Sequence, residues 1–289
     1  MDGRDGDGAV LCVGRVYADL IFTGLPRPPE AGREVFADGL TVAAGGGAAI
    51  TAAWLAALGR RTLLAAHLPA APFDAAVTRD LIAAGVDLSP CRPATGSEPQ
   101  VTVALPLDGD RAFVTRAPGP AIPPLDADAL RRAGVRHLHV GELRTLTDHP
   151  ALLDLARDLG ASLSADCAWD DAPDPGFADL VPRLDLFFPN AAEVAHLAAR
   201  GLDRWPAVTA VKRGADGAEL RRGGTILARP APALHAVDAT GAGDAFDAGF
   251  LDRWLAGGTD AACLEAGIAC GARAVTRAGG MPLPGPVPA

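Results

Sequence analysis

Short apolar runs alternate with longer segments whose apolar residues have helical spacing, most clearly in the second half of the chain. Short apolar runs predict buried strands at 9–14, 136–140, 162–166, 184–188 and 207–212. Helical spacing predicts helices at 48–58, 126–133, 149–159, 191–200, 243–256 and 260–275. Strands that alternate with helices are typical of a parallel sheet covered on both faces. The pattern therefore predicts an α/β fold.

Two segments do not follow this alternation. Residues 15–43 have strand character, interrupted by Pro26, Pro28 and Pro29. Within 100–116, two extended runs flank Asp108-Gly109, a pair that strongly favours a hairpin turn. We expect these segments to form a small separate sheet.

The composition is consistent with one large domain over residues 1–289, because 49% of the residues are hydrophobic. Only 5% are aromatic, so small side chains must build much of the core. The net charge of -9 argues against a nucleic-acid partner. The apolar run over 40–59 contains three consecutive glycines, which leave a helix too short to cross a membrane.

Cysteine usage indicates the compartment. The five cysteines form no Cys-x-x-Cys pair, and free buried thiols in a reducing compartment are the expected state. Residues 1–8 are polar and glycine-rich rather than a signal peptide. We therefore expect a cytoplasmic protein.

Lys212 is the only lysine, and this excludes two common nucleotide-binding motifs. A P-loop needs lysine directly after its last glycine, whereas Val211 precedes Lys212. A protein-kinase site needs a glycine-rich loop before its lysine and His-Arg-Asp after it, and neither occurs here. A nucleotide would then be held by backbone amides and arginines.

The segment 237–246 gives the strongest indication of chemistry. It reads Val-Asp-Ala-Thr-Gly-Ala-Gly-Asp-Ala-Phe, and Phe246, Phe250 and Trp254 predict a helix with an apolar stripe. Glycines let a backbone approach a ligand, and the amides at a helix start favour anionic groups. Asp244 is placed to accept a proton from an attacking hydroxyl. This arrangement suits phosphoryl transfer.

Residues 238–244, Asp-Ala-Thr-Gly-Ala-Gly-Asp, resemble the C-terminal signature of the ribokinase-like (PfkB) carbohydrate kinases. The resemblance implies a mostly parallel central sheet with helices on both faces, and a small β-sheet lid formed by about 15–43 and 100–116. It assigns the catalytic base to Asp244 and the anion hole to Gly241, Ala242 and Gly243.

The resemblance also implies a sugar site. Gly45, Gly46 and Gly47 lead into a helix that ends in Leu-Gly, as in the family's N-terminal signature. Asp19 matches the aspartate that binds substrate hydroxyls. Ile50 stands where the family usually has asparagine, and isoleucine can neither donate nor accept a hydrogen bond. This difference predicts an altered substrate, and Arg33 or Arg144 is expected to meet an anionic group on it.

Three further segments match the family's nucleotide and cation sites. Asn190-Ala-Ala-Glu193 resembles a motif associated, indirectly, with Mg²⁺ and the nucleotide phosphates, although the same pattern is also a helix capping box. Residues 212–218 resemble the nucleotide loop, with Lys212, Gly214 and Gly217 as binding residues. The resemblance also implies a monovalent cation such as K⁺ near a third set: Asp238, Thr240, Ala274, Arg277 and Gly279.

The expected activity is ATP-dependent phosphorylation of a hydroxymethyl group on a small sugar or sugar derivative. A nucleoside kinase and a kinase of an anionic sugar, such as a sulfosugar, stay open as alternatives, and so does a non-catalytic ligand-binding homologue. An aromatic side chain near the lid, such as Phe36 or Phe113, would favour the nucleoside. The expected partners are the substrate and ATP, without nucleic acid or membrane, and a homodimer through the lid is the expected assembly.

Overall fold

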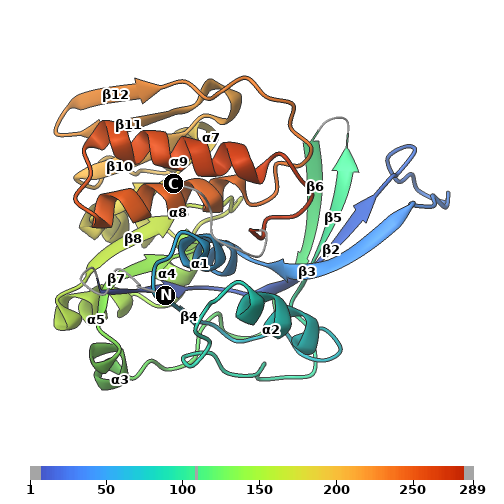
Figure 1. Ribbon diagram of the computed structural model, residues 1–289, viewed down its shortest axis with the longest axis horizontal. Coiled ribbons are helices and arrows are strands. Elements are labelled where there is room, and N and C mark those ends of the chain that lie inside the picture. The colour runs from blue at the N-terminus through green and yellow to red at the C-terminus, as the bar shows by residue number, and fades with distance from the viewer. Residues whose placement is uncertain (1–7, 108–109, 283–289) are drawn as a thin grey trace.

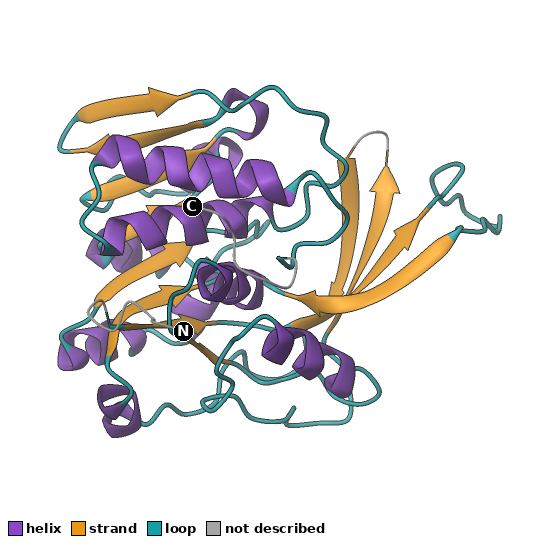
Figure 2. Cartoon of the chain, viewed as in Figure 1, coloured by secondary structure: helices purple, strands orange, loops and turns teal. Residues whose placement is uncertain are grey.

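The computed structural model describes residues 8–107 and 110–282, and its central feature is an eight-stranded sheet (Figures 1 and 2). The strand order is β12-β11-β10-β9-β8-β7-β1-β4. All pairs from β10 to β4 are parallel, and β11 and β12 extend the sheet as an antiparallel hairpin. The bounds are β1 (Ala9–Val13), β4 (Thr62–Ala65), β7 (Val135–Val140), β8 (Ser162–Asp166), β9 (Leu186–Phe188), β10 (Val208–Lys212), β11 (Ala218–Arg222) and β12 (Thr225–Arg229).

Helices cover both faces of this sheet. In β1, Val10 and Cys12 pack into one hydrophobic cluster, while Leu11 and Val13 pack into another on the opposite face. The first cluster includes residues of α1 (Gly47–Ala57), α2 (Asp74–Ala83), α8 (Ala242–Leu255) and α9 (Asp260–Ala274). The second includes residues of α3 (Ala127–Arg132), α4 (Leu143–Asp148), α5 (Leu152–Leu159), α6 (Phe177–Leu180) and α7 (Ala191–Ala199). The predicted α/β architecture is confirmed.

A second, four-stranded sheet projects to one side of these layers (Figure 1). Its order is β3-β2-β5-β6, with β2 and β5 parallel and the outer pairs antiparallel. The bounds are β2 (Tyr17–Thr23), β3 (Gly39–Gly45), β5 (Val101–Leu107) and β6 (Asp110–Arg116). The small separate sheet is therefore confirmed. The Asp108-Gly109 turn lies outside the described residues, and closure of this sheet as a lid stays a prediction.

The glycine loop before α1 joins the small sheet to the helices of the main domain. Gly46 has φ 97°, in the left-handed region, and a Cβ there would collide with the carbonyl oxygen of Arg15. The apolar run over 40–59 is thus a strand, a tight glycine connection and one helix. Among the described residues, no helix has the length and apolar character needed to span a bilayer.

Candidate active site

A cleft of about 900 Å³ opens between the two sheets, at the carboxyl ends of several main-sheet strands. Its volume is large for a small-molecule site, for which about 300–1,000 Å³ is typical. Many of the sequence-predicted site residues line it: Asp19, Gly46, Gly47, Ile50, Arg144, Asn190, Glu193, Lys212, Thr240, Gly241, Gly243 and Asp244. The fold therefore brings residues that are far apart in the sequence to one cleft.

The start of α8 forms the floor of the cleft. Gly241 is the N-cap of α8 and has φ 72°, in the left-handed region. A Cβ at Gly241 would lie 2.6 Å from the Cα of Gly280 and 3.1 Å from Cγ2 of Ile50. Glycine is thus required here for both its backbone angle and its size. Ile50 has a structural role as well, because it packs between this turn and the C-terminal segment.

Asp244 lies in the first turn of α8, half-buried and lining the cleft. Its Oδ1 lies against the glycine loop, 2.9 Å from where a Cβ on Gly47 would be. Burial, followed by the negative charge of Asp166, raises the pKa of Asp244 to about 7, against the opposing charge of Lys212. A carboxyl with a pKa near neutrality is well matched to general-base catalysis.

Asp19 lies on the other side of the same glycine loop. Its carboxylate occupies the position that a Cβ on Gly45 would take, and its side chain is buried at the edge of the cleft. The glycine loop therefore contacts both Asp19 and Asp244, and both line the cleft. Such a pair of carboxylates can accept hydrogen bonds from neighbouring hydroxyls of a polyol.

Lys212, at the end of β10, donates a hydrogen bond of 2.9 Å to Oδ1 of Asp166 at the end of β8. Its Nζ is also 3.3 Å from Oδ1 of Asp247, a fully buried residue of α8. Sequence reasoning missed both aspartates. Asp166 could have been found, because it ends a predicted strand at the sheet edge where α/β proteins bind ligands.

Asn190 and Glu193 form a reciprocal capping box at the start of α7. The Asn190 N–H donates to Oε2 of Glu193 at 2.7 Å, and the Glu193 N–H donates to Oδ1 of Asn190 at 2.9 Å. Burial, followed by the charge of Asp166, raises the pKa of Glu193 to about 7. The capping-box reading is thus confirmed, and both residues line the cleft, while their role toward Mg²⁺ and the nucleotide stays a prediction.

This donor set fits Mg²⁺ only indirectly. The side chains of Asn190 and Glu193 are engaged with each other, so few oxygens are free to coordinate an ion directly. The described residues contain no group of three or more His, Cys, Asp or Glu side chains placed to hold a metal. Glu193 and Asp166 can instead attract the water shell of a nucleotide-bound Mg²⁺, an ion that usually keeps several waters.

Two arginines line the wall nearest the second sheet. Arg15 is 9% exposed, and its Nη2 donates to the carbonyl oxygen of Gly119 at 2.9 Å. Its Nε lies 3.9 Å from Glu142, while Nη1 is buried and has no hydrogen-bond partner among the described residues. Arg144 is exposed, and no carboxylate of the described chain lies within 4.0 Å of its guanidinium. This wall therefore carries positive charge that is only partly compensated.

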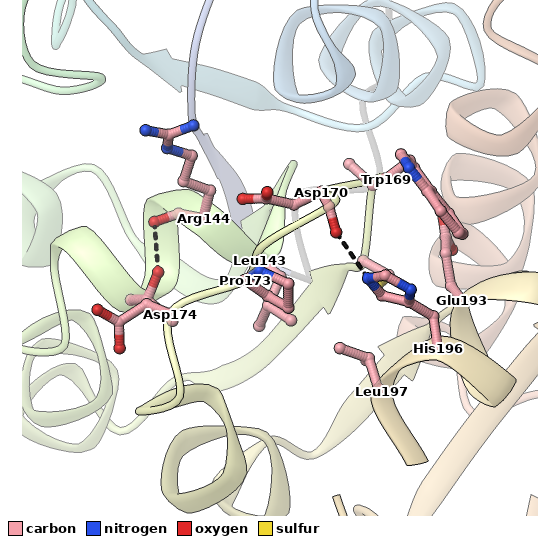
Figure 3. Close-up of a pocket in the computed structure, with 12 residues that line it drawn as sticks. Leu143, Arg144, Trp169, Asp170, Pro173, Asp174, Glu193, His196 and Leu197 are labelled. Atoms are coloured by element: carbon pink, nitrogen blue, oxygen red, sulfur yellow. Dashed lines mark hydrogen bonds between the residues drawn. The ribbon is translucent and has the colours of Figure 1, made fainter. Parts of the chain in front are cut away.

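The loop after β8 carries Trp169, which lines the cleft and also a small hollow beside it (Figure 3). Trp169 is 56% exposed and stacks on His196, with ring centroids 4.5 Å apart. His196 fixes the loop by donating from Nε2 to the carbonyl oxygen of Asp170 at 2.8 Å. The hollow behind this loop has a volume of about 10 Å³, enough for roughly one water. Trp169 lines the main cleft as well as this hollow, so its exposed ring is available to contact a ligand there.

Arg33 and two glycines of the predicted nucleotide loop do not line the cleft. Arg33 is exposed in the turn between β2 and β3, where it pairs with Glu30 at 3.1 Å. Gly214 is exposed in a short 3-10 turn, and Gly217 (φ 92°) is buried against the backbone that follows β12. Of the predicted nucleotide loop, Lys212 is thus the residue that reaches the cleft in this conformation.

The residues expected to hold K⁺ are partly brought together. Asp238 accepts hydrogen bonds from the N–H groups of Thr240 at 2.8 Å and Gly279 at 2.5 Å, which ties the two segments together. The Arg277 guanidinium instead lies 5.4 Å from the ring centroid of Trp54, a cation–π contact. A K⁺ site near Ala274 and these residues stays a prediction.

Comparison with known proteins identifies the family. A sequence model described as pfkB family carbohydrate kinase matches residues 8–285. An ATP-dependent ribose-1-phosphate kinase from Halopiger xanaduensis is 32% identical over 282 residues, covering 95% of this chain and 94% of that protein.

Solved structures share the fold. Arabidopsis thaliana ribokinase, complexed with ribose and ATP, superposes with a TM-score of 0.79 at 23% identity, covering 98% of this chain and 96% of its own. Adenosine kinase from Sinorhizobium meliloti superposes with a TM-score of 0.78 at 21% identity, covering 96% and 97%. The chain belongs to the pfkB family of carbohydrate kinases and is a phosphotransferase that acts on an alcohol group.

Proposed function

We propose that this enzyme phosphorylates a hydroxymethyl group on a small sugar or sugar derivative with ATP, and that Asp244 is the base. The observation that carries the proposal is the position of Asp244. Its carboxyl lies in the cleft, between the start of α8 and the glycine loop, with a pKa raised to about 7 by burial and then by Asp166.

In this mechanism Asp244 accepts the proton of the acceptor hydroxyl as the new O–P bond forms. The bond between the γ-phosphorus and the oxygen of the departing ADP breaks in the same displacement. Backbone amides at the start of α8, over residues 241–244, stabilise the charge on the transferred group. Mg²⁺, when bound with the nucleotide near Asn190 and Glu193, neutralises phosphate charge. Closure of the small sheet would exclude water, which otherwise competes as acceptor.

An anionic acceptor is favoured over a plain sugar by the two arginines. Arg15 and Arg144 line the cleft. The carboxylate of Glu142 lies 3.9 Å from Nε of Arg15 and balances part of this charge. Ile50 offers no hydrogen bond where a hydroxyl would otherwise be bound. The Halopiger relative is named as a kinase of ribose 1-phosphate, which carries such an anionic group. A phosphate or sulfonate on the acceptor would complement this wall.

A nucleoside acceptor is the second candidate. Phe113 lines the cleft and is 52% exposed, so it is available to stack on a base. A screen for ADP release separates the candidates, with panels of plain sugars, sugar phosphates, sulfosugars and nucleosides, in K⁺ and in Na⁺. We expect the highest kcat/KM with an anionic sugar. Turnover confined to nucleosides would favour the alternative, and the absence of turnover with every acceptor would contradict the proposal.

Two further features accompany this proposal. All five cysteines are buried and free, which supports a cytoplasmic location. The small sheet exposes apolar side chains at Leu40 and Val114, and Phe36 lies exposed near it. This surface supports a homodimer through the lid, which light scattering would test.

A further inference from the structure

The only lysine of the chain lies directly against the predicted anion hole. A Cβ on Gly243 would be 3.3 Å from Nζ of Lys212, so the ammonium and the start of α8 are in contact distance. Both residues line the cleft beside Asp244. A phosphoryl oxygen bound at the start of α8 would therefore lie close to the ammonium of Lys212 as well as to the backbone amides.

The ammonium is held from behind by two carboxyl groups. Asp166 accepts from Lys212 at 2.9 Å, and Asp247 lies 3.3 Å away on the buried side. Burial disfavours a charged amine, but the acidic groups around it, Asp166 foremost, outweigh this effect and hold the pKa of Lys212 above its usual range. Lys212 is thus a fixed positive charge at physiological pH.

Asp247 is the unusual member of this arrangement. It is fully buried and follows Asp244 by three residues, which places both on one face of α8. Its Oδ2 is buried and accepts no hydrogen bond in the described structure, as expected for an oxygen that carries a proton. Burial, then the charge of Asp166, raises the pKa of Asp247 well above its ordinary value.

A neutral Asp247 would explain why three groups can share this space. Its Oδ1 accepts from Lys212, and a proton on Oδ2 would remove the repulsion between this carboxyl and the charge of Asp166. Burying the carboxyl of Asp247 costs free energy that an apolar side chain at this position would not. A requirement to hold the ammonium in one position accounts for this cost.

We propose that Lys212 is a catalytic residue that contacts the transferred phosphoryl group, and that Asp247 is the positioning residue that holds its ammonium against Gly243. The proposal rests on the kinase chemistry above, in which the acceptor proton goes to Asp244 and the bridging oxygen leaves with ADP. Lys212 donates hydrogen bonds to the phosphoryl oxygens and keeps its own protons throughout. Its charge counts most in the transition state, when the phosphoryl group lies between donor and acceptor.

Binding and kinetics together test the role of Lys212. Calorimetry compares ADP with ADP–aluminium fluoride, a mimic of the phosphoryl group in transfer, for the native protein and Lys212→Met. We expect the mimic to bind at least about tenfold more weakly to Lys212→Met, with ADP affinity nearly unchanged. We also expect kcat to fall by about 10²-fold with little change in KM for ATP. Equal affinities for the mimic, or an effect confined to ADP and KM, would overturn the proposal.

Two variants of Asp247 test its positioning role. Asn is uncharged and can accept from Lys212 as a protonated carboxyl does, so Asp247→Asn should keep kcat within about threefold. Asp247→Leu fills the space without polar groups, and we expect it to reproduce most of the kcat loss of Lys212→Met. Normal kcat in a folded Asp247→Leu enzyme, or equal losses in both variants, would contradict positioning through a neutral carboxyl.

Chemical rescue separates loss of charge from misfolding. Lys212→Cys treated with 2-bromoethylamine forms a C–S bond with loss of bromide and regains an ammonium at nearly the native length. The five native cysteines are buried, so the same treatment of the native protein is the control. Recovery of mimic binding and of kcat is expected, and full alkylation without recovery would overturn the proposal. Because the calorimetry needs no acceptor, it tests Lys212 even if the sugar screen fails.

Discussion

Replacing Asp244 by asparagine should abolish catalysis and stabilise the protein, and the stabilisation should depend on pH. The substitution keeps the shape of the side chain and removes the base, so we expect kcat to fall by at least about 10²-fold. Nucleotide affinity should change little, since the base acts on the acceptor. A helix-capping aspartate would behave differently, because its loss would destabilise the protein at every pH above its own pKa.

The size of the stabilisation follows from the raised pKa. Burial and the charge of Asp166 move the pKa of Asp244 from 3.8 to about 7 in the folded protein. A raised pKa contributes stability that is complete below 3.8 and is lost as the pH rises to about 7. The loss is at most about 4 kcal/mol at pH 8 and about 2 kcal/mol at pH 5.5. Solvent reaches this half-buried carboxyl, so about half of each value is expected.

Urea unfolding at pH 8 and pH 5.5 measures this difference directly. Asp244→Asn should be more stable than the native protein by about 2 kcal/mol at pH 8 and by about 1 kcal/mol at pH 5.5. Asp203→Asn is the control, because the Asp203 side chain is 86% exposed, and it should change neither stability nor turnover. A fully active Asp244→Asn enzyme would remove Asp244 from the mechanism, and a pH-independent stability change would refute the origin given for its raised pKa.

Three further predictions concern the loop, the acceptor and Trp169. Gly243→Val should abolish turnover while circular dichroism stays unchanged, because its side chain would displace Lys212. Gly96→Val is the control, because a Cβ on Gly96 would meet no atom within 4 Å. Normal turnover of Gly243→Val would mean that the loop only caps the helix and does not bind the phosphoryl group. Ile50→Asn should raise turnover of simple sugars, because asparagine can bond to a hydroxyl. Efficient turnover of plain ribose or fructose by the native enzyme would contradict this prediction. Ligand binding should change tryptophan fluorescence, a change that Trp169→Phe removes; a persisting signal would place the ligand elsewhere.

Five strands of the main sheet, β1 and β7 to β10, were predictable because they are largely buried on both faces and appear as short apolar runs. The four-residue strand β4 is equally buried but was not predicted. Other elements carry weak signals. The helix α2 buries only Val77 and Leu81, so its apolar stripe is thin. The hairpin β11–β12 lies at the sheet edge and is rich in charged and exposed residues, which hides its alternation. The helix predicted over 149–159 is α5, which begins at Leu152. The residues before it belong to the separate helix α4, which ends at Asp148.

The site was predictable where its residues are adjacent in the sequence, and much less where they are not. The glycine turn and Asp244 form one motif, and their spacing alone points to an anion site with a base. The contact of Lys212 with Asp166 and Asp247 joins residues 46 and 35 positions apart. No local pattern marks such a cluster, and Asp247 taken alone resembles an ordinary polar residue on a helix. Its burial becomes evident only once α8 packs against α1 and α9.

The central claim is phosphoryl transfer from ATP to a sugar hydroxyl with Asp244 as the base. The most direct measurement is transfer of label from γ-³²P-ATP to the best acceptor of the screen, in the native enzyme and in Asp244→Asn. We predict labelled sugar phosphate from the native enzyme and at least about 10²-fold less from Asp244→Asn at equal nucleotide occupancy. Equal labelling by the two proteins, or label released only as inorganic phosphate, would contradict this account.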